Sequence, residues 1–133
     1  EAEVVRDSLL AVAGQLDSKM GGQELENTQA LTARRRTVYF CCQPEIDGKS
    51  AFGALFDAPE STECYRRTKS IIPQQALALT NSDLIHELSG HLAASLFQSL
   101  PADQQSDPTA FISAACQQIL SRDPTEIEQR VCQ

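Results

Sequence analysis

Apolar residues recur at three- and four-residue steps along most of the chain, which is the spacing of one face of an α-helix. The first run predicts a helix over roughly 2–20. Its apolar stripe consists of Val5, Leu9, Val12, Leu16 and Met20. Gly21 and Gly22 follow the stripe, and glycine commonly ends helices. We therefore expect a long first helix that packs this stripe against the rest of the domain.

Further helices are predicted between 73 and 120 from start signals and periodicity. Pro73 suits the first turn of one helix, and the "NSD" break at 81–83 separates it from a longer helix that ends near Leu100. Asp107 and Pro108 open another helix. The expected buried side chains are Leu84, Ile85, Leu88, Leu92 and Leu96 in the longer helix, and Phe111, Ile112, Ala115, Cys116 and Ile119 in the later one.

The last helix is predicted to begin at "DPTE". We assign Asp123 as its N-cap, Pro124 as its first residue and Glu126 as the partner in a capping box. Ile127 and Val131 are spaced to form its buried side.

The segment between the first helix and Pro73 predicts an irregular arm. Residues 23–33 are polar, and 37–42 are β-branched, aromatic or small, which favours a short extended segment. A short helical turn is expected near 50–59. The sequence thus predicts an all-α fold of five or six helices around one core, with a long irregular arm and one short extended segment, as a single domain over 1–133.

Composition narrows the function classes. The formal charge of −7 argues against broad binding to nucleic acid or to anionic lipid. The apolar runs are too short to span a bilayer, and the opening residues already have a helical pattern rather than that of a signal peptide. We therefore expect no nucleic acid partner, no membrane span, and a C-terminal fragment of a larger protein.

The stretch "IHELSGHL" (85–92) comes close to a zinc-protease motif. His86 and His91 are five residues apart rather than four, so they point about 140° apart on a helix. This spacing opposes a metal-dependent hydrolase that uses His86, Glu87 and His91, and no third ligand is evident. Asp83, Glu87 and His91 share one ridge, which we interpret as a solvated helix face.

Positive charge gathers in two short runs, Arg34–Arg36 and Arg66–Lys69. Arginine forks bind carboxylates and phosphates, so Asp57, Arg66 and Arg67 are the candidate binding residues. The alternative interpretation, which we favour, is that these arginines cap helices and pair with the chain's own acids.

Five cysteines, an odd number, lack the spacing of a zinc or haem site, and no cofactor is expected in this chain. They are Cys41, Cys42, Cys64, Cys116 and Cys132. One interpretation is that they are small buried hydrophobes. The other is an exported protein with disulfides from Cys64 to Cys41 or Cys42, and from Cys116 to Cys132. Cys64 lies beside arginines but lacks an evident catalytic base.

Several segments together resemble the C-terminal part of a domain of unknown function found in large planctomycetal proteins, often joined to a cytochrome c-like domain. They are "RDSLLAV", "RRRTVYF", "LFDAP" followed by "CYRR", "IIPQQALALTNSDLI" and "SRDPTEIE". The stretch after Tyr39 is less basic than the resemblance leads us to expect. The resemblance implies an exported or periplasmic protein and gives no catalytic residues to transfer.

From these observations we expect a non-catalytic helical scaffold or interaction module of a larger exported, cytochrome-linked protein. Its partners would be other domains of that protein or a separate protein. The alternative is an accessory or catalytic part of a polysaccharide-acting hydrolase, with Asp57, Arg66 and Arg67 near a cleft.

Overall fold

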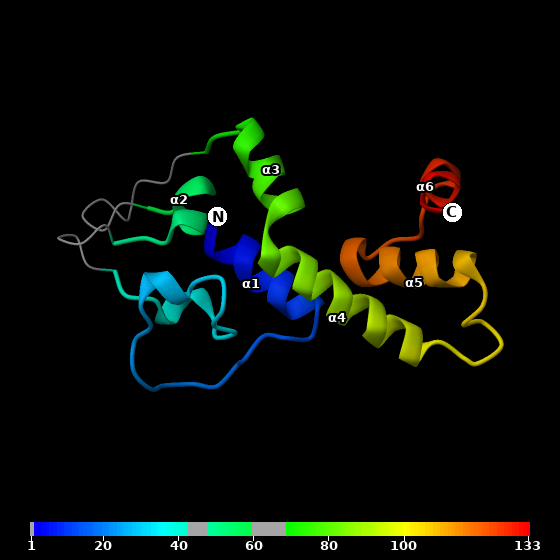
Figure 1. Cartoon of the computed structure of the whole chain (residues 1–133), viewed down its shortest axis with the longest axis horizontal. Helices are drawn as coiled ribbons and strands as arrows, with labels where there is room; N and C mark the ends of the chain where they lie inside the picture. The colour runs from blue at the N-terminus through cyan, green and yellow to red at the C-terminus, as the bar shows by residue number, and fades with distance from the viewer. Residues whose placement is uncertain (1, 43–47, 60–68) are drawn as a thin grey trace. The chain divides into compact units, whose positions relative to one another are not determined.

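The structure, a computed structural model, describes residues 2–42, 48–59 and 69–133 (Figure 1). Within these ranges it contains six α-helices, two 3₁₀ turns and no β-strand, so the all-α prediction is confirmed. The elements are α1 (Ala2–Val12), η1 (Asn27–Gln29), η2 (Thr37–Tyr39), α2 (Ala51–Leu55), α3 (Pro73–Asn81), α4 (Asp83–Ser99), α5 (Pro108–Leu120) and α6 (Glu126–Cys132). No described helix is both long and apolar enough to cross a bilayer.

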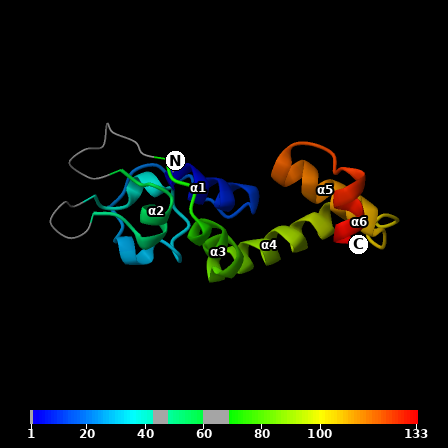
Figure 2. The ribbon, with the colours of Figure 1, turned by 90° about the horizontal axis from the view of Figure 1, so that it is seen from above.

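The chain divides into two compact units, Glu1–Leu88 and Ser89–Gln133, with the boundary inside α4. In the first unit, α1 contacts α2 and η2, and α2 contacts α3. In the second, α5 and α6 lie against each other (Figure 2). The prediction of one domain around one core stays a prediction.

Helix α1 ends at Val12, eight residues before the predicted end. Gly14 has a φ of +67°, the left-handed conformation that favours glycine. The amide of Gly14 donates to the carbonyl of Ala11 at 3.0 Å, and the amide of Gln15 donates to that of Leu10 at 2.8 Å. This pair of bonds is a Schellman motif, which ends the helix before Gly21 is reached.

The buried face of α1 is also offset from the predicted stripe. Its fully buried members are Ala2, Arg6 and Leu10, whereas Val5 and Leu9 are half-buried. An arginine therefore sits in the middle of the packed face. The prediction placed the stripe one residue too early because it counted only apolar residues.

The predicted extended segment at 37–42 is wrong in its first part, because Thr37–Tyr39 forms the 3₁₀ turn η2. Two isolated parallel bridges hold the arm instead, Asp17 to Arg35 and Leu25 to Phe40. The amide of Leu25 donates to the carbonyl of Tyr39 at 2.8 Å. The arm thus satisfies its backbone groups through scattered bonds rather than a regular ladder.

Three helix starts follow simple local chemistry, and two of them, at Pro73 and Asp107, were predicted. The hydroxyl of Ser50 accepts the amide of Gly53 and caps α2, and Pro73 is in the first turn of α3. The carboxylate of Asp107 accepts the amide of Thr109 at 2.9 Å and caps α5.

Helix α6 begins later than predicted. Thr125, not Asp123, is its N-cap, and Glu128, not Glu126, completes the capping box. The carboxylate of Asp123 instead accepts the side-chain amide of Gln117 at 2.7 Å. Because that carboxylate is already bound, the cap role falls to the next residue with a hydroxyl.

The α6 cap predicts a measurable pH dependence. Glu128 forms two hydrogen bonds with Arg122, at 2.9 and 2.7 Å, and accepts the amide of Thr125 at 2.8 Å. Bonding to Arg122 and then to Thr125 holds the pKa of Glu128 far below its ordinary value. Because the folded pKa is depressed, the stabilisation is present above the unfolded pKa and is lost as pH falls toward the folded value.

The protection of the α6 amides against exchange, measured relative to the intrinsic rate at each pH, should therefore fall as the pH drops below about 4. The variant Glu128→Gln should show faster exchange at neutral pH and a flatter pH profile in α6. An unchanged profile in this variant would show that Glu128 does not hold the cap.

Candidate functional site

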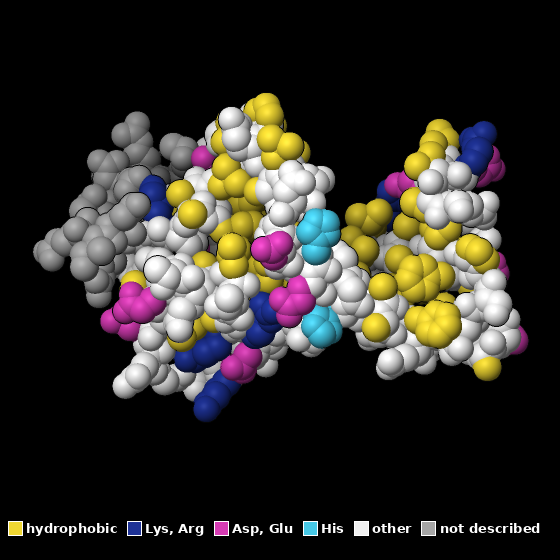
Figure 3. All heavy atoms as spheres, viewed as in Figure 1, with side chains coloured by type: hydrophobic (Ala, Val, Ile, Leu, Met, Phe, Trp, Pro, Cys, Tyr) yellow, Lys and Arg dark blue, Asp and Glu magenta, His cyan; other side chains and the backbone are white. Residues whose placement is uncertain are grey.

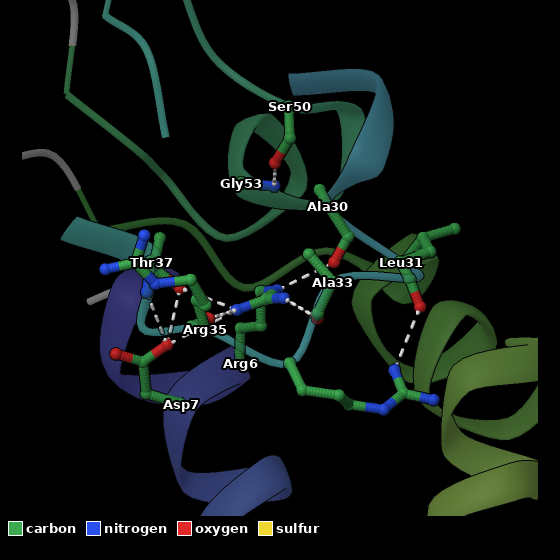
Figure 4. A network of polar contacts seen from close by, with 10 residues as sticks. Arg6, Asp7, Ala30, Leu31, Ala33, Arg35, Thr37, Ser50 and Gly53 are labelled. Carbon is green, nitrogen blue, oxygen red and sulfur yellow. Dashed lines mark hydrogen bonds and ion pairs between the residues drawn. The ribbon is translucent and has the colours of Figure 1, made fainter. Parts of the chain in front are cut away.

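Among the described residues, Arg6 is a charged side chain that lies in the core, where it is only 2% exposed. Its Nε donates to the carbonyl of Ala30 at 2.7 Å, its Nη1 to that of Arg35 at 2.8 Å, and its Nη2 to that of Ala33 at 2.5 Å (Figure 4). The guanidinium carbon lies 4.9 Å from the Phe40 ring centroid. Burial lowers the pKa of Arg6 from its ordinary value. One side chain on α1 thus binds three carbonyls of the arm.

Asp7 completes the contact between α1 and the arm. Its Oδ1 accepts both the amide of Thr37, at 2.9 Å, and the Thr37 hydroxyl, at 2.6 Å. The same oxygen lies 3.5 Å from Nη1 of Arg6. Arg6 therefore donates to carbonyls of the arm, and the adjacent Asp7 accepts from an amide and a hydroxyl of the arm. We call these two residues the arm clamp.

Two arginines of the basic triplet bind the chain's own groups, as the structural interpretation expects. Nη2 of Arg34 lies 2.5 Å from Oε1 of Glu87 on α4. The Arg35 guanidinium lies 3.7 Å from the Tyr39 ring centroid and donates to the carbonyl of Gly21 at 2.5 Å. Arg34 thus joins the arm to α4, and Arg35 joins two parts of the arm to each other.

A cavity of about 630 Å³ lies between α1, the arm and α2. Its described walls are largely apolar, with charged side chains that include Asp7, Arg36 and Lys49. The volume is in the range of small-molecule sites. However, Arg6 and Asp7 on its wall already form the arm clamp.

Asp57 does not line this cavity, and its carboxylate binds another part of the chain. It lies just after α2 with a φ of +60°. Its carboxylate accepts the amide of Ser70 at 2.6 Å and the Ser70 hydroxyl at 2.8 Å. These bonds, the backbone one first, lower the pKa of Asp57. The other two candidate binding residues, Arg66 and Arg67, lie outside the described residues.

Within the described ranges no disulfide is present. Cys116 and Cys132 are free thiols, so the expected bridge between them is not formed. Cys41 is buried, with its Sγ 3.7 Å from Nδ2 of Asn27. Cys41 is also a free thiol, so its expected disulfide with Cys64 is not formed. Cys64 lies outside the described residues, so a pairing with Cys42 stays a prediction.

The described residues contain no group of three His, Cys, Asp or Glu side chains placed to hold a metal ion. In the near-motif on α4, Glu87 is paired with Arg34. The spacing of the two histidines already argues against a metal-dependent hydrolase. The ion pair of Glu87 with Arg34 is a second argument, because it occupies the carboxylate that such an enzyme would use.

The sequence interpretation missed the arm clamp. It named the later arginines and passed over Arg6, although Ala2, Leu10 and Ala13 flank it at helical spacing. A single arginine within a stripe of small and aliphatic residues is the signal that would have found it.

A family model matches the chain over residues 1–133. The matching family model is described as PSD1, protein of unknown function (DUF1553). No curated protein and no solved structure matches the chain.

Proposed function

The chain belongs to the PSD1 family, whose function is unknown (DUF1553), and on that premise we propose that it is a non-catalytic helical scaffold or interaction module. The proposal includes its place in a larger exported, cytochrome-linked protein, with no cofactor bound by this chain. Its partners would be other domains of that protein or a separate protein.

The observation that carries the proposal is the internal use of the polar groups. Arg6, Arg34 and Arg35 all bind carbonyls or carboxylates of the chain itself. A guanidinium engaged by several internal acceptors is poorly placed to recognise a substrate anion. This supports a role in holding the arm on α1 rather than in binding a ligand.

The hydrolase alternative needs a carboxylate that faces a groove. Among the described residues, Asp57 does not line the cavity, and both of its oxygens accept bonds from Ser70. A general acid needs a raised pKa, whereas that of Asp57 is lowered. Its environment therefore favours the scaffold.

The variant Asp57→Asn separates the two functions. Asparagine tolerates positive φ, so the backbone conformation is retained while the charge is lost. Release of reducing sugar from a panel of soluble polysaccharides would be measured with the full-length protein. We expect any rate to stay within about twofold of the unmodified protein.

The matched control is Ser70→Ala, which removes the hydroxyl donor but keeps the Asp57 carboxylate and the backbone amide that binds it. A fall of roughly 100-fold in Asp57→Asn without a similar fall in Ser70→Ala would support the hydrolase alternative instead.

A further inference from the structure

The second unit buries far less than its sequence pattern predicts. Of the apolar side chains expected to face a core in α5 and α6, only Ile112 is buried. Ile127 is 65% exposed and Val131 is 78% exposed, although both have the spacing of a packed face. Figure 3 shows hydrophobic side chains over both helices.

Helices of this length are not held by their own propensity. Helix α6 has seven residues and α5 has thirteen, so most of their stability must come from tertiary packing. A unit of about this size rarely has enough core to stand alone. An uncovered apolar face on such short helices therefore indicates a surface that another group covers.

The charge around this face limits what can cover it. Residues 89–133 carry five carboxylates and two arginines, a net charge of −3. Arg122 is already paired with Glu128, which leaves Arg130 against four other carboxylates. A second copy of the chain would bring like charge to the interface, and an anionic membrane would also be repelled.

We infer that the α5–α6 face, defined by Ile119, Leu120, Ile127 and Val131, binds a protein surface with an apolar centre and a rim of lysine or arginine. The apolar centre would cover the exposed aliphatic side chains. The basic rim would meet Asp123 and Glu126, which lie beside them in sequence. This inference rests on the proposed interaction function and names the chemistry of the partner.

Two synthetic amphipathic helical peptides test the inference on the 133-residue chain. They share one leucine face and differ only in having lysine or glutamate beside it. Calorimetry should show at least about tenfold tighter binding of the lysine peptide. Amide exchange should slow in α5 and α6 when that peptide is bound.

The double variant Ile127→Ser with Val131→Ser keeps every charge and should bind at least about tenfold more weakly. The matched control is Met20→Ser, which removes an equally exposed apolar side chain (78%) from the first unit and should leave binding unchanged. Equal loss in both variants, or equal binding of both peptides, would overturn the inference.

If something other than a basic protein surface covers the α5–α6 face, the experiments give distinct results that would also overturn the inference. A second copy would appear as a concentration-dependent mass in light scattering that the double variant abolishes. A membrane would appear as binding to vesicles of phosphatidylglycerol, and cover from the chain itself as slow exchange of α5 and α6 without any peptide. None of these outcomes depends on the sugar-release assay, so the two proposals can fail separately.

Discussion

Replacement of Arg6 by alanine is expected to lower the free energy of unfolding of the first unit by about 3–5 kcal/mol. The change leaves the buried carbonyl of Ala30 and the partly buried carbonyls of Ala33 and Arg35 without the donor that they bind. Each unsatisfied buried carbonyl costs about 1–3 kcal/mol. Both tyrosines lie in residues 1–88, so urea unfolding followed by tyrosine fluorescence reports this unit.

Two further variants define the cause of that loss. Arg6→Lys keeps the positive charge but not the planar fork, and should lose about 1–3 kcal/mol. Arg36→Ala removes an exposed arginine of the same arm and should change stability by less than about 0.5 kcal/mol. A lysine variant as stable as the unmodified chain would show that charge, not fork geometry, holds the arm.

Local chemistry explains which helix starts could be predicted from the sequence. Ser50, Pro73 and Asp107 act within one turn of the helices that they start, so a short sequence window contains the whole interaction. The start of α6 was misassigned because Asp123 and Thr125 can both cap. Gln117, six residues before Asp123, donates to the Asp123 carboxylate, and this bond leaves Thr125 as the N-cap.

Long-range contacts explain the features that could not be predicted. The carbonyls that bind Arg6 are 24 to 29 residues away in sequence, so the stripe on α1 can place Arg6 on the packed face but cannot show which groups it binds there. The same limit applies to Asp57, whose partner Ser70 lies 13 residues on. A charged side chain is usually assigned to the surface, and the exception depends on acceptors that only the fold brings together.

The offset of the buried face gives the second large prediction. Leu10 is fully buried beside Arg6, at 0% exposure, whereas Leu9 is half-buried and Val4 on the same helix is exposed. Leu10→Ala should therefore lower the free energy of unfolding by about 2–5 kcal/mol, through lost burial and the cavity left behind. Val4→Ala should cost less than about 0.5 kcal/mol.

Leu9→Ala distinguishes the two assignments of the packed face of α1. The apolar spacing alone predicts that Leu9 is at the centre of that face, whereas in the fold Leu10 is at its centre. Tyrosine fluorescence in urea should rank the losses as Leu10, then Leu9, then Val4. If Leu9→Ala were as costly as Leu10→Ala, the helix would have to be rotated toward the apolar stripe. That rotation would carry Arg6 away from the carbonyls of the arm, so the Leu9 and Arg6 measurements test one orientation of α1 independently.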